Sequence, residues 1–224
     1  MHRIPGQLNV TLSLTFSPDG RYLAATLGGR NGLRVFDRDK EWSEAFRDDQ
    51  YGDNSHAAAF APDGRLATTS FDGMIRLYKY EPNSDSANFR LVDQPSKVPS
   101  GNKPYRIAFS PDGKRLAVGY DDVTDVDLFD GVSLKRIRGP AMTDAAPPSG
   151  GLEEIAWSQD GHVLYAAGNG ATDDTGRLGL LAWNEGGRGA KRWLKYCTPR
   201  MGPTGMDALP DGRILVATFL PALV

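Results

Sequence analysis

The sequence has few of the residues on which redox, metal and membrane functions depend. Cys197 is its only cysteine, so an internal disulfide is excluded, and no cysteine and histidine cluster has the spacing of a zinc site. No apolar run is long enough to cross a bilayer, and residues 1–10 lack the apolar core of a signal peptide. We therefore predict a cytoplasmic protein without a membrane segment.

An excess of charge of one sign is also lacking. The 28 acidic residues nearly cancel the 26 basic ones, and the formal net charge of the 224 residues is −2. Binding to nucleic acid or to an anionic membrane needs a basic excess on one face of the protein. The composition therefore predicts neither a nucleic-acid partner nor a membrane partner.

Residues typical of catalysis are scarce. The three histidines are His2, His56 and His162, and no serine, histidine and aspartate share predicted loops. The glycine-rich segments 27–32 and 184–192 join strands, whereas phosphate-binding loops open helices. We predict no catalytic residue, no metal site and no cofactor.

One turn motif, in contrast, occurs five times. In its third copy, Ser110-Pro111-Asp112-Gly113, proline presets the second turn position and glycine accepts the left-handed conformation, which closes a tight hairpin. The residue before each turn recurs at spacings of 44, 49, 48 and 51 residues, the range typical of propeller repeats. These residues are Phe16, Phe60, Phe109, Trp157 and Ala208.

The third copy also shows the strand pattern. Strands are predicted over 105–109, 115–120, 126–129 and 133–138, with almost no helical periodicity, so we predict an all-β protein. A single four-stranded sheet cannot bury both of its faces, so each copy needs a neighbour. Small residues in the second strand fit such close packing: Ala24, Ala25, Ala67, Ala117, Ala166, Ala167 and Ala217.

The repeat resembles the WD40 family of β-propellers. Besides the turn motif, the third strands end where the Trp-Asp pair of that family falls, at residues 36–37, 78–79, 129–130 and 183–184. The aspartate between the second and third strands is clearest as Asp72, whereas the Gly-His pair is missing, and the buried polar tetrad of the family is incomplete. The resemblance implies a β-propeller of four-stranded antiparallel blades.

The period places four complete blades and a partial fifth in one propeller over residues 1–224. Because the fifth copy stops after its second strand, we expect either a piece of a longer propeller or an arc that associates with another chain. The repeat units cover residues 11–50, 56–95, 105–139, 153–197 and 205–224.

Loop lengths indicate where a partner would bind. The turns between first and second strands are all short, whereas residues 139–154 and 168–179 form long loops on the other face. Acidic side chains gather in this sector, which we predict to bind a basic protein or peptide. The candidate residues are Asp121, Asp122, Asp125, Asp144, Glu153, Glu154, Asp173 and Asp174, with Arg177 as the nearby base.

The resemblance implies a protein-interaction platform or scaffold rather than an enzyme. The alternative is a propeller enzyme such as a metal-dependent lactonase or hydrolase, to which Glu153, Glu154 and Asn169 would contribute carboxylate and amide ligands. A calcium loop over 122–131 is disfavoured, because Asp127 falls within a strand and is expected to point outward, away from its acidic neighbours.

Overall fold

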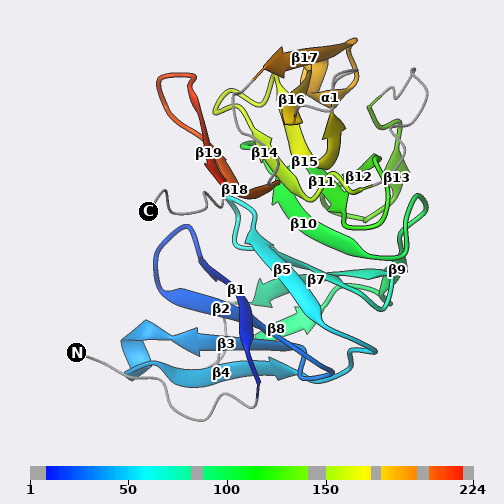
Figure 1. The fold of residues 1–224 in the computed structure, drawn as a ribbon. Helices are drawn as coiled ribbons and strands as arrows, with labels where there is room; N and C mark the ends of the chain where they lie inside the picture. Colours follow the sequence, from blue (N-terminus) through cyan, green and yellow to red (C-terminus); the bar gives the residue numbers. More distant parts are fainter. Residues whose placement is uncertain (1–8, 82–87, 141–149, 173–177, 196–201, 219–224) are drawn as a thin grey trace, which may run out of the picture. The chain divides into compact units, whose positions relative to one another are not determined.

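The computed structural model describes residues 9–81, 88–140, 150–172, 178–195 and 202–218, and it is built almost entirely of antiparallel strands (Figure 1). The chain divides into two compact units. Unit 1 comprises Met1–Val98 and Asn102–Ile107, and unit 2 comprises Pro99–Gly101 and Ala108–Val224.

Unit 1 contains two sheets, which correspond to the first two repeats. The first is ordered β1-β2-β3-β4, and the second is ordered β5-β6-β7-β8, with β9 also pairing with β7. The strands of the first sheet are β1 (Thr11–Phe16), β2 (Tyr22–Leu27), β3 (Leu33–Asp37) and β4 (Ser43–Asp48), with a 3-10 turn at Arg38–Lys40. Those of the second are β5 (Ser55–Phe60), β6 (Leu66–Ser70), β7 (Met74–Glu81), β8 (Asn88–Leu91) and β9 (Ser96–Lys97).

Unit 2 continues the same pattern. The remaining sheets are ordered β10-β11-β12-β13, β14-β15-β16-β17 and β18-β19, and of β10 only residues 108–109 belong to unit 2. The strands are β10 (Pro104–Phe109), β11 (Arg115–Tyr120), β12 (Val126–Asp130), β13 (Arg136–Ile137), β14 (Glu154–Trp157), β15 (Leu164–Thr172), β16 (Leu178–Trp183), β17 (Lys191–Lys195), β18 (Pro203–Ala208) and β19 (Ile214–Thr218). A four-residue helix, α1, covers Asn184–Gly187.

All five repeated turns adopt the predicted geometry. In the first, the Gly20 N–H donates to Ser17 O at 2.8 Å, the Ser17 hydroxyl donates to Asp19 at 2.5 Å, and Gly20 has φ +68°. The same backbone bond closes the other four turns, whose glycines also lie in the left-handed region. Local turn chemistry thus sets the register of the first two strands in every sheet.

Within each unit, neighbouring sheets cover each other. In unit 1, β5 packs against β1 and β2, and one apolar cluster joins Tyr22, Val35 and Tyr78. In unit 2, β11 packs against β14, and a second cluster joins Leu128 to the fully buried Trp183. The stacking of four-stranded sheets that the repeat predicted is therefore confirmed within both units.

The predicted long loop over residues 168–179 is shorter than expected. Strand β15 continues through Thr172, with a register shift between Ala167 and Thr172, and β16 begins at Leu178. The Gly170 N–H donates to Gly151 O at 2.9 Å. This hydrogen bond to the segment before β14 gives the backbone of the last part of β15 a partner, so the strand can extend beyond Ala167. Within the described residues, no helix is long and apolar enough to span a membrane.

Candidate interaction surfaces

The predicted acidic sector is partly assembled in unit 2. The Tyr120 N–H donates to Leu152 O at 3.0 Å, and the Leu152 N–H donates to Val123 O at 3.2 Å. These bonds place the loop after β11 beside the segment that precedes β14. Asp121 belongs to the first segment and Glu153 to the second, so residues 32 positions apart share one side of the unit.

Glu153 is buried but hydrogen-bonded. Its carboxylate accepts the backbone N–H of Asn169 at 3.0 Å and the side-chain amide of Asn169 at 3.1 Å. Burial raises the pKa of Glu153; the Asn169 donors oppose this rise, and the nearby charge of Asp121 adds to it. Both oxygens of the Glu153 carboxylate thus accept hydrogen bonds from Asn169. In the metal-dependent hydrolase considered as the alternative, this carboxylate would be a metal ligand.

Asp122 and Asp125 differ in exposure. Asp122 is exposed, and a side chain at Gly101 would meet its Oδ1 at 2.6 Å, so glycine permits the close approach of the two loops. Asp125 is partly buried, and its pKa is raised by burial first and then by the charge of Asp127, while a hydrogen bond with Ser100 acts in the opposite direction. Asp122 is therefore the most accessible carboxylate of this group.

Glu154, the first residue of β14, is also buried, with 2% of its surface exposed, as are all four residues of that strand. The remaining predicted residues lie outside the described part of the chain: Asp144, Asp173, Asp174 and Arg177. Among the described residues, no group of three histidine, cysteine or acidic side chains is placed to hold a metal ion.

The prediction that Asp127 points outward is wrong. Asp127 is fully buried on β12; it accepts the Tyr120 hydroxyl and the Ser100 hydroxyl, the latter at 3.0 Å, and forms an ion pair with Arg136 at 2.8 Å. Alternation failed as a guide because four consecutive residues of β12 are buried, so side chains on both faces of this strand are internal.

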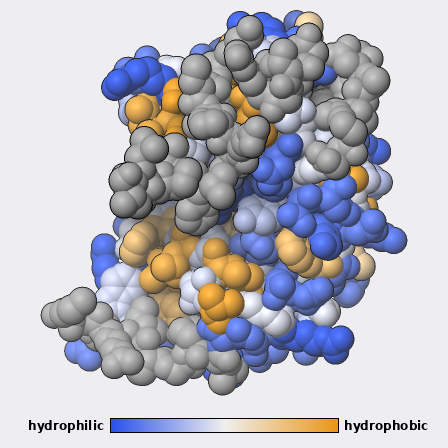
Figure 2. All heavy atoms as spheres, viewed as in Figure 1, coloured by the Kyte–Doolittle hydropathy of each residue, from blue (hydrophilic) through white to orange (hydrophobic). Residues whose placement is uncertain are grey.

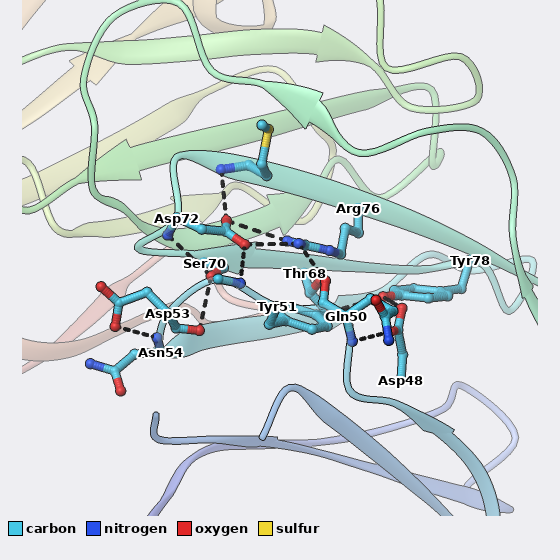
Figure 3. A network of polar contacts seen from close by, with 12 residues as sticks. Asp48, Gln50, Tyr51, Asp53, Asn54, Thr68, Ser70, Asp72, Arg76 and Tyr78 are labelled. Carbon is cyan, nitrogen blue, oxygen red and sulfur yellow. Dashed lines mark hydrogen bonds and ion pairs between the residues drawn. The ribbon is translucent and has the colours of Figure 1, made fainter. Parts of the chain in front are cut away.

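A second polar network, which sequence reasoning did not assemble, lies in the second repeat (Figure 3). The carboxylate of Asp72 accepts two guanidinium N–H groups of Arg76, the closer at 2.8 Å, and the backbone N–H groups of Gly52 and Met74, each at 3.0 Å. Arg76 also donates to Gln50 O at 2.8 Å. The Asp72 and Arg76 side chains are 12% and 4% exposed, so the pair is essentially internal.

Two tyrosines extend the network (Figure 3). The Tyr51 hydroxyl lies 2.8 Å from the Thr68 hydroxyl and 2.9 Å from the Tyr78 hydroxyl, which donates to Asp48 at 2.7 Å. The guanidinium of Arg76 stacks over the Tyr51 ring at 3.8 Å. Burial raises the pKa of Tyr51 to about 12, so its hydroxyl stays protonated at neutral pH.

Only Asp72 was identified as a member of this network from the sequence. Its partners come from the β4–β5 connection and from β7, and nothing in the local sequence pairs Tyr51 with Tyr78. Two signals were available: Gly52 lies near the place of the missing Gly-His pair, directly after Tyr51, and Tyr78 lies at the place of the Trp-Asp pair. The network therefore joins the β4–β5 connection to β6, to the β6–β7 turn and to β7.

An apolar face of β1 is exposed. Val10, Leu14 and Phe16 have 60%, 61% and 56% of their surface accessible, and the Phe16 ring centroid lies 6.1 Å from that of Trp42. Hydrophobic atoms form an orange patch over β1 in Figure 2. A patch of large apolar side chains on a strand is typical of a surface that another element covers.

Two solved structures have a fold similar to that of this chain. The chain superposes on Kuenenia stuttgartiensis hydrazine synthase with a TM-score of 0.70 and 20% identity, over 99% of this chain and 60% of that one. It superposes on the Dos1 propeller with a TM-score of 0.68 and 13% identity, over 93% of this chain and 53% of that one. With its four-stranded antiparallel sheets, the chain is a β-propeller protein.

A family match falls within the second repeat. Residues 53–79 match the family described as "WD domain, G-beta repeat", and this range includes Asp72, Arg76 and Tyr78. Protein hir1 of Aspergillus terreus is 31% identical over 111 residues, a match that spans 48% of this chain but only 10% of that relative. The matched residues thus fall in the family that the sequence motifs resemble, over part of the second repeat.

Proposed function

We propose that this chain is a non-enzymatic protein-interaction module that binds a basic segment of a partner protein through loops of unit 2. Protein binding is the common role of WD40 domains. The observation that supports this surface most directly is the pairing of the loop after β11 with the segment before β14, which fixes the loop that carries Asp121 and Asp122. Opposite charge on a partner would steer its encounter with this surface.

Neutralising two of these carboxylates tests the proposal. We expect the double substitution Asp121→Asn with Asp122→Asn to weaken binding of a fluorescein-labelled peptide carrying five lysines and arginines. The dissociation constant of the peptide should rise about three- to tenfold, because each exposed ion pair contributes up to about 1 kcal/mol. Fluorescence anisotropy measures the affinity at low and at raised salt concentration. Added salt should weaken peptide binding to the wild type more than to the variant, because it screens the charges that the variant lacks.

The matched control removes the same charge elsewhere. Glu41→Gln with Asp93→Asn changes two exposed carboxylates of unit 1 and should leave peptide binding within twofold of the wild type. Equal losses in both double variants would mean that the peptide responds only to net charge. The proposed surface would then be rejected.

The metal-dependent hydrolase remains the alternative function. It would be favoured by a calcium-dependent rise in melting temperature, since a ligand that binds the folded state stabilises it. The cytoplasmic location is likewise a prediction that stands on the sequence alone.

We propose, second, that a further blade of the same class covers the apolar face of β1, and that the repeats over residues 1–224 belong to one longer propeller. Phe16 is 56% exposed, whereas Trp157, at the equivalent position of the fourth repeat, is 6% exposed, and Phe60 packs into the core of unit 1. The chain covers 60% and 53% of the two similar structures, which therefore contain residues beyond the matched part.

A hydrophobic dye tests this second proposal. The isolated chain should be a monomer that enhances the fluorescence of anilinonaphthalene sulfonate, and Leu14→Ser with Phe16→Ser should remove most of that enhancement. A stable dimer that the same substitutions dissociate would show that a second copy covers the face. A monomer that does not bind the dye would contradict both arrangements.

A further inference from the structure

Asparagine followed by glycine occurs twice in the chain, as Asn31-Gly32 and Asn169-Gly170. Such a pair is prone to spontaneous loss of the side-chain amide, because glycine has no side chain to hinder its own backbone nitrogen. The two pairs share this local chemistry but have different surroundings in the structure. Their hydrogen bonds therefore decide which of the two can react.

The reaction, deamidation, begins when the glycine nitrogen attacks Cγ of the asparagine side chain. A bond forms between that nitrogen and Cγ, the bond from Cγ to Nδ2 breaks, and Nδ2 leaves as ammonia with the proton of the glycine N–H. Water then opens the cyclic imide at one of its two carbonyl carbons, which gives aspartate or isoaspartate. A glycine N–H without an acceptor and an asparagine side chain that can turn favour this reaction.

The Asn169-Gly170 pair is held at both reacting groups. The Gly170 N–H donates to Gly151 O at 2.9 Å, so the attacking nitrogen already has an acceptor. The side-chain amide of Asn169 donates to Glu153 at 3.1 Å, and its backbone N–H donates to the same carboxylate at 3.0 Å. Both residues of the pair also lie within β15. Reaction at Asn169 therefore requires these hydrogen bonds to break first.

The Asn31-Gly32 pair lies outside the strands, in the connection between β2 and β3. Among the described residues, the Gly32 N–H has no hydrogen-bond acceptor. The bonds that fix this connection end on other atoms, since Gly32 O accepts the Leu27 N–H at 3.0 Å and Asn31 O accepts Arg34 at 2.8 Å. The Asn31 side chain donates to Gly28 O at 2.7 Å. The attacking nitrogen is thus free, and the side chain has to release this bond to turn toward it.

Packing requires glycine at position 32. Gly32 has φ +60°, and a Cβ on it would lie 2.1 Å from Asp48 O and 2.6 Å from the Tyr51 ring. The residue that makes Asn31 reactive is therefore fixed by the contact of this connection with the segment around Tyr51. Isoaspartate at position 31 would add one carbon to the main chain and shift Gly32 against that segment.

We propose that Asn31 is a site of spontaneous deamidation in the folded protein, whereas Asn169 is protected from it. Exposure alone would give the opposite order, because Asn169 is exposed and Asn31 is half-buried. The carboxylate formed at position 31 has no N–H to donate to Gly28 O. Because Tyr51 belongs to the polar network of the second repeat, a shift of Gly32 against it is expected to destabilise unit 1.

Peptide mapping by mass spectrometry tests the proposal. The folded chain is kept at mildly alkaline pH, which favours deprotonation of the glycine nitrogen, and is digested at intervals. Asn31 should be converted about tenfold or more faster than Asn169, because reaction at Asn169 requires more hydrogen bonds to break. An isoaspartyl methyltransferase should label the peptide that contains position 31. In urea that unfolds the chain, the two rates should become similar.

Two variants separate the effect of hydrogen bonding from that of the local sequence. Asn31→Gln has a longer side chain that disfavours ring closure, so it should stop the reaction at position 31 and leave the rate at Asn169 unchanged. Glu153→Ala removes the acceptor of the Asn169 amide and should accelerate the reaction at Asn169 severalfold, with the Asn31 rate in the same sample as internal standard.

Four results would each overturn the proposal. These are equal rates at the two asparagines in the folded chain, faster conversion of Asn169, a difference in rate that persists in urea, and an unchanged Asn169 rate in Glu153→Ala. The comparison of folded with unfolded wild type needs no variant, so the test does not depend on whether Glu153→Ala folds.

Discussion

Replacing Arg76 by methionine is expected to lower the free energy of unfolding by about 3 kcal/mol or more, because it leaves the buried Asp72 carboxylate without its cation. Methionine retains much of the apolar volume of the arginine stem, so the loss reports the charge rather than a cavity. Two backbone N–H groups, from Gly52 and Met74, would still bind the carboxylate. Urea denaturation followed by circular dichroism measures the change in the transition of unit 1.

The pH dependence of stability gives this prediction a second signature. Burial acts to raise the pKa of Asp72, but Arg76 and the Gly52 N–H outweigh it, and the net pKa lies below the usual value. In the wild type, Asp72 therefore stabilises the fold above pH about 4, and this contribution is lost as the pH falls through the lowered pKa. In the Arg76→Met variant, burial should raise the pKa of Asp72 above its usual value. The free energy of unfolding should then fall as the pH increases from the usual pKa of aspartate to this raised pKa.

A surface ion pair provides the control for Arg76. Arg47 and Glu44 form an ion pair at 2.8 Å in which their side chains are 52% and 34% exposed. Arg47→Met should therefore lower the stability much less than Arg76→Met does. Similar losses in the two variants, or an unchanged slope of stability against pH in Arg76→Met, would show that the network does not depend on the ion pair.

Replacing Trp183 by alanine is expected to cost about 3–5 kcal/mol, the range for a fully buried tryptophan. Trp183 ends β16 with none of its surface exposed and packs within an apolar cluster of unit 2 that also contains Leu128 and Leu164. The loss combines the apolar area returned to water with the cavity left behind, because close-packed neighbours relax only partly. Thermal unfolding followed by near-ultraviolet circular dichroism measures it.

Two other variants make the Trp183 prediction decisive. Trp183→Phe keeps an aromatic ring and should cost less than the alanine variant, so it remains measurable if Trp183→Ala does not fold. Trp42→Ala removes the same side chain from a partly exposed site beside Phe16 and should cost about 1 kcal/mol. If Trp42→Ala were as destabilising as Trp183→Ala, the assignment of Trp183 to the central packing of unit 2 would be wrong.

The sequence predicted the strands of the third repeat with small errors. Predicted strands over 115–120 and 126–129 correspond to β11 (Arg115–Tyr120) and β12 (Val126–Asp130). The predicted outer strand over 133–138 is reduced to β13 (Arg136–Ile137), because Asp130 instead accepts the N–H groups of residues 132 and 133 in a turn. The end of a strand depends on whether local hydrogen bonds from side chain to backbone replace those of the sheet. The alternation of polar and apolar residues contains no information on these bonds.

Prediction of the charged side chains was poorer. Glu153 and Glu154 were both assigned to a binding surface, yet both are buried, and Glu153 is bound to Asn169. Asp127 was expected in solvent and lies in the core. The sequence identifies where acids are concentrated, but the partners that allow an acid to be buried come from distant segments.

The sequence by itself determined the five hairpin turns and the period of the repeat. Each turn depends on four adjacent residues, as in Ser17-Pro18-Asp19-Gly20, whose conformational preferences act whatever surrounds them. Only the tertiary structure decided which polar side chains are internal, because the pairing of Asp72 with Arg76 and of Tyr51 with Tyr78 requires strands and loops already folded together. The conformation of a turn depends on residues adjacent in the chain, whereas the burial of a polar side chain, and the hydrogen bonds that make this burial possible, depend on residues adjacent in space.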